Sequence, residues 1–425
     1  MNAFTGFRPP RLLLPRADLD LRRWCVIACD QYTSDSAYWA RAAAEAGDAP
    51  STLQLIYPEV FLGAADKPAR VARIQAAMRR YLADGLLREH AGVVLVQRTL
   101  ADGRVRRGLM LELDLEHYDY APGSASLIRP TEGTIVERLA PRIEVRRDAE
   151  LELPHVLVLI DDPRHTVIEP LAATRPQPLY DGALMLGGGR VAGFAPHADA
   201  QAQAMAALAA LGGSSPLLFA VGDGNHSLAT AKASWERIKA TAGPDHPARW
   251  ALVEVDNIHD PALEFSPIHR LLLGVQGELQ EALAAHFGAR LRITPVADAA
   301  AMRAALAALP PGLHGAGLLQ PGGRCALLAV PADGDGLDIA TWQGFVDALL
   351  AAGGARDVDY VHGDEALAQL AAQPGHAGLH LAVLGKGELI GRVARHGPLP
   401  RKSFSMGEAD EKRFYLEARR IREAA

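Results

Sequence analysis

Six consecutive residues, Gly222-Asp223-Gly224-Asn225-His226-Ser227, place an acid, an amide, an imidazole and a hydroxyl in one short segment. They separate an apolar run, 217–221, from a helix-like stretch, 228–238, which predicts a strand, a glycine-rich turn and a helix start. Backbone N–H groups at a helix N-terminus attract anions, and glycine lets a phosphate approach closely. Asp and His in one turn can hold a metal ion or move a proton. The pattern indicates the phosphate-handling part of a nucleotide-dependent enzyme.

A second polar group, CDQYTS at 29–34, follows an apolar, strand-like stretch. Here Asp30 is a carboxylate at a strand end, where active-site groups often lie in α/β layers. The structural alternative is that Thr33 or Ser34 caps the helix that contains Tyr38 and Trp39. Both interpretations stay open.

The segment IRPTEGT at 128–134 combines arginine, threonine and glutamate around a glycine, and Arg142 follows it. Arginine pairs bidentately with phosphate or carboxylate, so this segment predicts a loop that binds anions and a metal ion. The alternative is a helix-capping box at Thr131, although the Glu or Gln that such a box needs three residues later is missing.

Two weaker groups are His269-Arg270 and Lys402-Ser403. A His-Arg pair is equally typical of a surface or linker segment. The Lys-Ser pair is interpreted either as a phosphate site before a helix or as a solvated loop. The sequence contains no P-loop G-x-x-x-x-G-K-[ST], no G-x-S-x-G elbow and no zinc-type spacing of Cys or His. Gly187-Gly188-Gly189 lacks the strand and the spacing of a dinucleotide fingerprint.

The elements that must position these groups follow from the hydrophobic pattern. Asp102-Gly103 between two β-rich arms predicts a hairpin over 93–115. Strands are also expected at 155–160, 217–221 and 250–255, and helices at 36–46, 67–83, 198–211 and 228–240.

After Arg270 short helices and strands alternate, which predicts a separate α+β domain with a boundary near 270–276. Its expected helices are 278–287, 299–309, 341–352 and 365–372, and its expected strands are 290–294, 315–320, 325–330, 358–361 and 380–384. A charged helix is expected over 407–423.

Composition limits the function classes. The 425 residues suffice for two or three domains, and 44 Lys and Arg against 50 Asp and Glu give a formal charge of −6. Without a basic block, nucleic acid is not an expected partner. Three cysteines cannot form a disulfide framework, so Cys25 and Cys29, in an apolar stretch, are predicted to be buried reduced thiols. The N-terminus is unlike a signal peptide and no apolar run approaches the ~20 residues of a membrane span, so a cytoplasmic location is expected.

With these groups in place, the chain resembles the domain-of-unknown-function 1015 family over nearly its whole length. Five ordered motifs carry the resemblance: CDQY (29–32), RPTEGT (129–134), VGDGNHS (221–227), HR (269–270) and PRKSFSMGE (400–408). The turn is also similar to the D-G-x-H-R box of the ParB/sulfiredoxin superfamily, which grips nucleotide phosphates. Asp223, Gly224 and His226 match that box, whereas Ser227 replaces its arginine. Another cation would therefore have to supply the charge, the candidates being Arg129, Arg270 and Lys402.

The resemblance implies an α+β fold with a ParB/sulfiredoxin-like N-terminal core, 1–272, and a smaller α+β C-terminal domain, 273–395. A motif loop and helix, 396–425, are expected to return to the core. Because the superfamily includes free-serine kinases, the leading expectation is a phosphotransferase that uses ATP or ADP and Mg²⁺. Its acceptor would be a small hydroxylated metabolite, with free serine as one candidate.

In this hypothesis the catalytic residues are Asp30 as general base, Glu132 and His226, and the metal ligands are Asp223 and Glu132. The residues expected to bind nucleotide or phosphate are Arg129, Thr134, Arg142, Gly222, Asp223, Gly224, Asn225, Ser227, His269, Arg270, Lys402 and Ser403.

Other functions stay open at this point. They are a non-catalytic nucleotide-binding regulatory protein or DNA clamp, a metal-dependent phosphatase or hydrolase, and a sulfiredoxin-like reductase, which needs a thiolate near the turn. The expected partners are a nucleotide and a small-molecule substrate, and a homodimer is an assembly that the sequence leaves open. No membrane and no nucleic acid are expected.

Overall fold

The computed structural model describes residues 6–174, 176–334 and 336–423, and the chain divides into two compact units. The first unit comprises Met1–Glu264, Lys386–Pro398 and Gly407–Ala425, and the second comprises Phe265–Gly385 and Leu399–Met406. The second unit thus starts earlier than the predicted 273 and includes part of the predicted returning segment. Helices and strands are mixed in both units, which confirms the α+β class.

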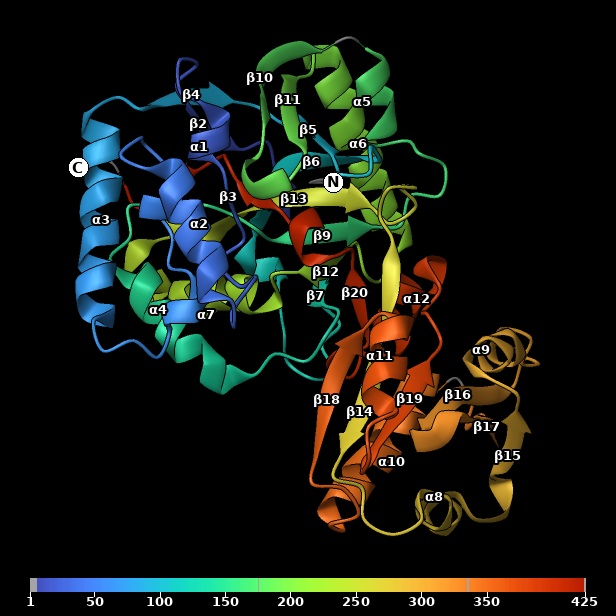
Figure 1. Cartoon of the computed structure of the whole chain (residues 1–425). Coiled ribbons are helices and arrows are strands. Elements are labelled where there is room, and N and C mark those ends of the chain that lie inside the picture. The colour runs from blue at the N-terminus through green and yellow to red at the C-terminus, as the bar shows by residue number, and fades with distance from the viewer. Residues whose placement is uncertain (1–5, 175, 335, 424–425) are drawn as a thin grey trace. The chain divides into compact units, whose positions relative to one another are not determined.

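The first unit contains the elements that surround the candidate site (Figure 1). Its helices are α1 (Leu21–Trp24), α2 (Ser36–Ala46), α3 (Lys67–Ala83), α4 (Leu139–Arg147), α5 (Glu169–Ala173), α6 (Ala198–Ser214), α7 (Asn225–Ala242) and α12 (Lys386–His396). Its strands are β1 (Phe7–Arg8), β2 (Arg11–Pro15), β3 (Val26–Ile27), β4 (Leu87–Ala91), β5 (Val94–Thr99), β6 (Val105–Asp114), β7 (Ile128–Pro130), β8 (Leu151–Glu152), β9 (Leu157–Ile160), β10 (Gln177–Ala183), β11 (Arg190–Ala195), β12 (Phe219–Asp223), β13 (Trp250–Asn257), β21 (Phe414–Tyr415) and β22 (Arg419–Arg420). The predicted helices 36–46 and 67–83 are confirmed at their predicted bounds.

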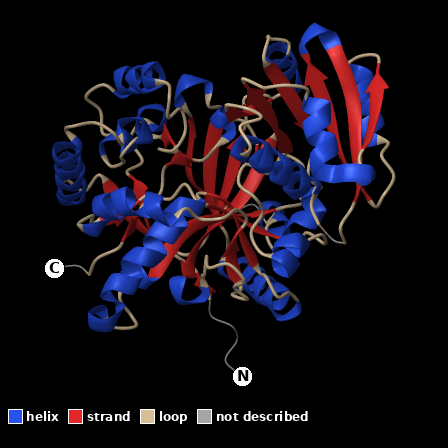
Figure 2. Ribbon diagram, turned by 90° about the horizontal axis from the view of Figure 1, so that it is seen from below, coloured by secondary structure: helices blue, strands red, loops and turns tan. Residues whose placement is uncertain are grey.

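A nine-stranded sheet organises the described residues of this unit, in the order β10-β11-β5-β6-β13-β9-β12-β7, with β1 paired to β6. The predicted hairpin is confirmed, because β5 and β6 pair antiparallel. Neighbouring residues of a strand point to opposite faces of a sheet. Val94 and Val96 pack into one hydrophobic cluster, and Leu95 and Leu109 pack into another. Both faces are therefore covered, and Figure 2 shows helices around these strands.

The second unit is a smaller sheet with helices. Its strands are β14 (Phe265–Leu273), β15 (Arg292–Val296), β16 (Leu313–Gln320), β17 (Arg324–Pro331), β18 (Asp357–His362), β19 (His376–Leu381) and β20 (Phe404–Met406), and its helices are α8 (Leu279–Phe287), α9 (Ala299–Ala307), α10 (Asp338–Ala351) and α11 (Asp364–Ala371). The described strands are ordered β15-β17-β16-β19-β14-β18, with β20 beside β14. The predicted strand 380–384 corresponds to β19, which starts four residues earlier.

None of the helices in the described part of the chain combines the length and the apolar character that crossing a membrane requires.

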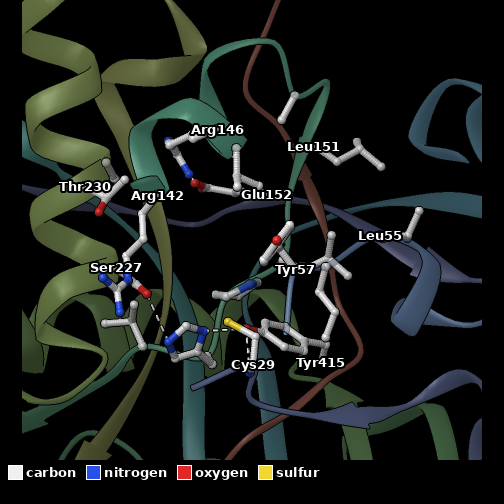
Figure 3. A pocket seen from close by; sticks show the side chains of 18 of the residues that line it. Cys29, Leu55, Tyr57, Arg142, Arg146, Leu151, Glu152, Ser227, Thr230 and Tyr415 are labelled. Atoms are coloured by element: carbon white, nitrogen blue, oxygen red, sulfur yellow. Dashed lines mark hydrogen bonds and ion pairs between the residues drawn. The ribbon is translucent and has the colours of Figure 1, made fainter. Parts of the chain in front are cut away.

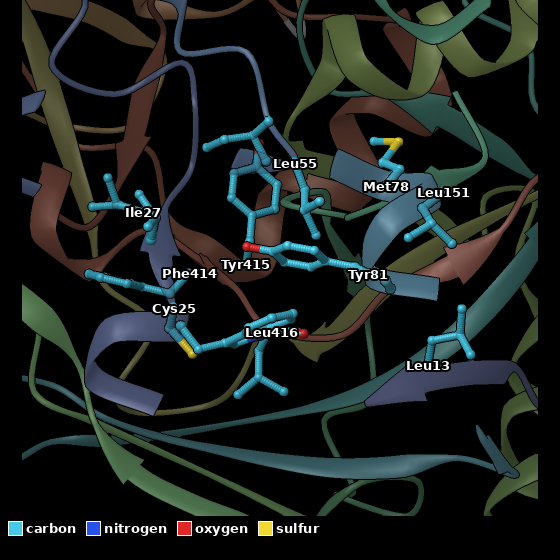
Figure 4. Close-up of a cluster of buried hydrophobic side chains, with 14 of the residues drawn as sticks. Leu13, Cys25, Ile27, Leu55, Met78, Tyr81, Leu151, Phe414, Tyr415 and Leu416 are labelled. Carbon is cyan, nitrogen blue, oxygen red and sulfur yellow. Dashed lines mark hydrogen bonds between the residues drawn. The ribbon is translucent and has the colours of Figure 1, made fainter. Parts of the chain in front are cut away.

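The C-terminal strap, residues 407–423, is extended apart from one 3-10 turn at Ala409–Glu411, so the prediction of a charged helix over 407–423 is wrong. Its strand β21 pairs with β3, and β22 pairs with β8. Residues 412–419 are all buried, which no amphipathic helix allows, because one face of such a helix stays in water. Figure 4 shows Phe414, Tyr415 and Leu416 within the hydrophobic cluster that contains Leu55 and Tyr81. Pairing with distant strands therefore overrides the helical propensity of this segment.

A buried guanidinium anchors the strap. Arg413, 3% exposed, donates to the carboxylates of Glu254 and Glu417, and its Nε donates to the carbonyl of Pro154 at 2.9 Å. Glu417 also accepts the hydroxyl of Tyr180. Buried charges are tolerated when they are paired and hydrogen-bonded, and each of these groups has a partner inside the unit.

Replacing Arg413 tests this anchor. Arg413→Met removes the cation that pairs with the buried carboxylates of Glu254 and Glu417, so the free energy of unfolding should fall by about 3–5 kcal/mol in chemical denaturation. The control is Arg422→Met, because the Arg422–Asp148 pair is 45% and 57% exposed. That change should stay within about 0.5 kcal/mol. Equal losses in the two variants would contradict the anchoring role.

Candidate functional site

The turn of 222–227 joins β12 to α7. Gly224 has φ of +76°, and a Cβ there would lie 3.0 Å from the Cα of Val156, so a larger residue would meet backbone. The carbonyl of Gly224 accepts the N–H groups of Ser227 and Leu228 at 2.9 and 3.0 Å, which opens the helix. The predicted strand, turn and helix are confirmed, and the helix starts at Asn225 rather than at 228. Residues 225–227 therefore form the first turn of α7.

A loop after β7 lies beside this turn, because β7 and β12 are parallel neighbours. Thr131 donates to the carbonyl of Val221 from its hydroxyl at 2.7 Å and from its amide at 3.2 Å. The capping-box interpretation of Thr131 is therefore wrong: its side chain holds β12 and caps no helix. Since the carboxyl ends of parallel strands meet at one edge of a sheet, Asp223, the last residue of β12, and Glu132, two residues after β7, both lie at this edge.

Two polar atoms beside the turn lack partners in the part of the chain that the structure describes. They are Oδ1 of Asn225 and Oγ1 of Thr134, both buried. The same loop is tied to the helix by the N–H of Ile135, which donates to Nε2 of His226 at 3.4 Å. Buried polar atoms generally find a hydrogen-bond partner, so these two have unused capacity for water or a ligand.

His155 connects the turn to the loop that carries Asp30. Its Nε2 lies 3.0 Å from Oγ of Ser227 and 3.5 Å from Oδ2 of Asp30, and its Nδ1 lies 2.6 Å from the hydroxyl of Tyr415. The same hydroxyl accepts the N–H of Cys29 at 3.2 Å. One imidazole thus contacts groups from three distant segments. Figure 3 labels two of its partners, Ser227 and Tyr415, together with Cys29.

The pKa values of Asp30 and His155 move in opposite directions. Burial alone would raise the pKa of Asp30, but the charge and hydrogen bond of His155, the amide of Gln31 and the charge of Lys412 hold it below its usual range. Burial alone would lower the pKa of His155, but Asp30 raises it, with smaller contributions from Asp223 and other acids. Each group of this pair therefore favours the charged form of the other.

Lys412 brings a second positive charge to the turn. Its Nζ lies 3.4 Å from Oδ2 of Asp223, whose Oδ1 accepts the N–H of Gly224 at 2.9 Å. Lys412 from the strap and His155 from the segment before β9 thus bring basic side chains to the turn.

The predicted cations of the first unit are used differently. The guanidinium of Arg129 donates to the carbonyls of Ser124, Pro216 and Ala394 at 2.9 to 3.4 Å, so it ties loops together. Arg142 pairs with Glu59, its Nε donating at 2.8 Å. Neither guanidinium has the turn as its partner.

Four predicted residues belong to the second unit. Arg270 is buried and donates to Oε1 of Gln343 at 2.7 Å and to the carbonyl of Lys402 at 3.0 Å. The hydroxyl of Ser403 donates to the carbonyl of Pro400 at 2.5 Å. These bonds hold the 399–406 segment against β14, and the other predicted site residues lie in the first unit.

His269, the fourth of these residues, forms a cluster with Asp364 and His380 in which the three ligand-type atoms lie within 4.8 Å of one another. Each imidazole Nε2 contacts Oδ1 of Asp364, at 3.2 and 3.0 Å. Because Nδ1 of His269 accepts the N–H of Leu381 at 3.1 Å, its proton belongs on Nε2. A histidine that binds a metal donates its second N–H instead, so this cluster is organised as a hydrogen-bonded group and not for a metal ion.

Sequence reasoning missed three of the central residues, His155, Tyr415 and Lys412. The first begins the predicted strand 155–160, where a single histidine carries no spacing signal. The other two lie in the strap that was expected to be helical. The capping alternative for Thr33 or Ser34 is wrong, because Asp35 caps α2 by accepting the N–H of Tyr38 at 2.9 Å.

The two N-terminal cysteines are free, and Cys25 is buried, as predicted. Cys29 is partly buried beside His155, and burial, with the charges of Asp30 and Glu59, raises the pKa of its thiol. A thiol that stays protonated is a weak nucleophile, which argues against a sulfiredoxin-like reductase.

Comparison of the chain with known proteins identifies the family to which it belongs. The family model described as "Protein of unknown function (DUF1015)" matches residues 7–349. No curated protein matches the chain.

Solved structures with a similar chain path include a mutant free serine kinase in complex with AMP (TM-score 0.40, 10% identity, 73% of this chain and 91% of that chain). A second is SbnI with a C-terminal truncation from Staphylococcus aureus (TM-score 0.37, 13% identity, 70% of this chain and 82% of that chain). A third is a conserved hypothetical protein from Pyrococcus furiosus (TM-score 0.34, 12% identity, 72% of this chain and 90% of that chain). The ParB/sulfiredoxin likeness of the core stays a prediction.

The His269 cluster gives a pH-dependent stability. Burial and the neighbouring His380 lower the pKa of His269 from 6.5 to about 4. As pH falls from about 6.5 to about 4, the unfolded chain takes up this proton first, so stability falls with acidification by about 2–4 kcal/mol. In His269→Asn, whose side-chain oxygen can still accept the N–H of Leu381, denaturation across this range should show a shallower pH slope.

The matched control is His286→Asn, an exposed histidine of the same unit. It should keep the full slope of the unaltered protein. If His269→Asn and His286→Asn have the same slope, the burial of a neutral His269 is not its source.

Proposed function

The chain belongs to the DUF1015 family of proteins of unknown function, and we propose that it is a Mg²⁺- and nucleotide-dependent phosphotransferase that acts on a hydroxyl of a small metabolite. The observation that carries the proposal is the position of Asp30. Its carboxylate lies 3.5 Å from His155, which in turn lies 3.0 Å from Ser227 in the first helical turn of α7. The imidazole of His155 thus contacts both the carboxylate of Asp30, which can bind a hydroxyl, and the N-terminus of α7, where a helix favours phosphate.

The phosphate half of the site is supported by its local charge. The N-terminus of α7, an 18-residue helix, carries a partial positive charge. Lys412 adds a cation at the same turn, and His155, whose pKa Asp30 raises, lies beside it. The buried oxygen of Asn225 and hydroxyl of Thr134 have unused hydrogen-bonding capacity there. Phosphoryl transfer depends mainly on such positioning and charge stabilisation.

Carboxylates at the sheet edge suit a hard cation. Asp223 ends β12 and Glu132 follows the neighbouring parallel strand β7, and carboxylate oxygens are ligands that Mg²⁺ prefers. Bound Mg²⁺ would neutralise charge on the transferring phosphoryl group. Asp223 also faces Lys412, which keeps this carboxylate near the position where phosphates would lie.

Asp30 is proposed as the base for the acceptor. The acceptor oxygen forms a bond to phosphorus while the bond from phosphorus to the leaving nucleotide oxygen breaks, and the hydroxyl proton passes to Asp30. Because the pKa of Asp30 is held low, the carboxylate is ionised at neutral pH and is ready to orient that hydroxyl. His155 is a positioning residue, since it holds Asp30 and faces the turn. ATP or ADP as donor, free serine as reference acceptor, a cytoplasmic location and a homodimer stay predictions.

The test is a phosphoryl-transfer assay. The protein is incubated with Mg²⁺, with ATP or ADP, and with a panel of hydroxylated metabolites that includes serine, and products are followed by ³¹P NMR. A new phosphomonoester signal is expected. Asp30→Asn should lower its rate of formation by about 10²- to 10⁴-fold, the usual contribution of a general base. Nucleotide affinity should change by less than about threefold, because Asp30 is assigned to the acceptor.

Asp18→Asn is the control, because Asp18 is 62% exposed and pairs with Arg16 at the surface. It should leave rate and affinity unchanged. Equal rates in Asp30→Asn and the unaltered protein would remove Asp30 from the mechanism. Release of phosphate from a phosphorylated metabolite without any nucleotide would favour a hydrolase instead.

A further inference from the structure

A cavity of about 170 Å³ lies inside the first unit, next to the candidate site. Its lining comes from segments 55–62 and 142–156, from the first turns of α7, and from Met78 and Tyr415. In Figure 3, Leu55 and Leu151 lie on one side of the cavity and Ser227 and Arg142 on the other. The cavity therefore reaches from the hydrophobic core to the first turn of α7.

The interior of the cavity is apolar and its charges are already paired. Leu, Ile, Met, Val and Ala side chains form most of the wall. The two arginines on the wall pair with carboxylates, Arg142 with Glu59 and Arg146 with Glu152, the second at 2.6 Å. A phosphate would have to break one of these ion pairs, so this cavity suits an uncharged group.

The polar end of the cavity is the part that meets the site. His155, Ser227, Tyr415 and Cys29 all line it, and the Nε2 of His155 that contacts Ser227 also contacts Asp30. A ligand that fills the cavity would present its polar end to this imidazole and hydroxyl. For size, an engineered cavity of about 150 Å³ lined by Leu, Ile and Phe binds benzene, so about six carbon-sized atoms can be accommodated.

We propose that this cavity binds an apolar group of five to seven carbon atoms carried by the acceptor, whose hydroxyl then lies at His155 and Asp30. This inference rests on the proposed function, because the acceptor is defined by that reaction. Acceptors with an alkyl or phenyl group are therefore preferred over serine. Each additional buried methylene contributes about fourfold in affinity, so the preference in KM should reach about 100-fold.

A nucleobase is the competing occupant. Its ring nitrogens need hydrogen-bond partners along the edge of the base, whereas the polar side chains of the wall are largely taken by Arg142–Glu59 and Arg146–Glu152. Hydrogen-bond donors or acceptors buried without partners reduce affinity. The wall thus favours an alkyl or phenyl group.

The test needs no turnover in its first arm. 2-Phenylethanol is titrated into the full-length protein by calorimetry, with Ala231→Leu as the filled variant, since Ala231 lines the cavity on α7. Ala240→Leu, exposed on the same helix, is the control. Binding to the unaltered protein and to Ala240→Leu is expected, with at least a tenfold loss in Ala231→Leu. Ala149→Leu, at another wall position, provides a second filled variant if the first does not fold.

The second arm separates this inference from the proposed function. Phosphorylation of serine and of a phenyl-bearing hydroxy acid is compared in the same proteins, and filling the cavity should raise KM for the phenyl substrate alone. Binding of 2-phenylethanol without any phosphoryl transfer would keep the cavity assignment and reject the kinase. Phosphorylation of serine without 2-phenylethanol binding would reject the cavity assignment. Loss of nucleotide affinity in Ala231→Leu would also reject the cavity assignment, because it would place the nucleobase in the cavity.

Discussion

The buried ion pairs of Arg413 are the interaction on which the candidate site depends. A guanidinium that is 3% exposed cannot leave Glu254 and Glu417 without stranding charges in a low-dielectric interior. The strap is therefore fixed in register, and the residues on either side of Arg413 are fixed with it. Lys412 reaches Asp223 and Tyr415 reaches His155 for this reason. The last part of the chain thus completes a site whose turn lies near its middle.

The site itself is a balance of charges around one imidazole. The nearby carboxylates, above all Asp30, raise the pKa of His155, and His155 in turn lowers the pKa of Asp30. Lys412 places its ammonium 3.4 Å from Asp223 at the turn, where the sequence has serine in place of an arginine. The basic side chains beside the turn, Lys412 and His155, therefore come from segments that are distant in the sequence. They do not come from the motif loops, whose arginines hold carbonyls and a glutamate in place.

Local pattern predicted much of this molecule, and long-range pairing explains what it missed. The hairpin, the helices at 36–46 and 67–83 and the strand-turn-helix at Gly224 depend on neighbouring residues, so the sequence reveals them. β14 was missed because a proline, a histidine and an arginine interrupt its apolar run. The helix predicted over the strap was wrong for a related reason. The charged residues of the strap are typical of a solvated helix, but their partners lie elsewhere in the chain. Of the site, Asp30 and the turn were visible, and His155, Lys412 and Tyr415 were not.

The most direct test of this account is a calorimetric titration of Mg²⁺ with ATP and with ADP into the full-length protein and two lysine variants. Lys412→Met removes the cation at the turn, and Lys239→Met removes a more exposed one from the far end of α7. The account predicts one nucleotide per chain, binding at least tenfold weaker in Lys412→Met and unchanged in Lys239→Met. No nucleotide binding by the unaltered protein, or equal affinity in all three proteins, would contradict it.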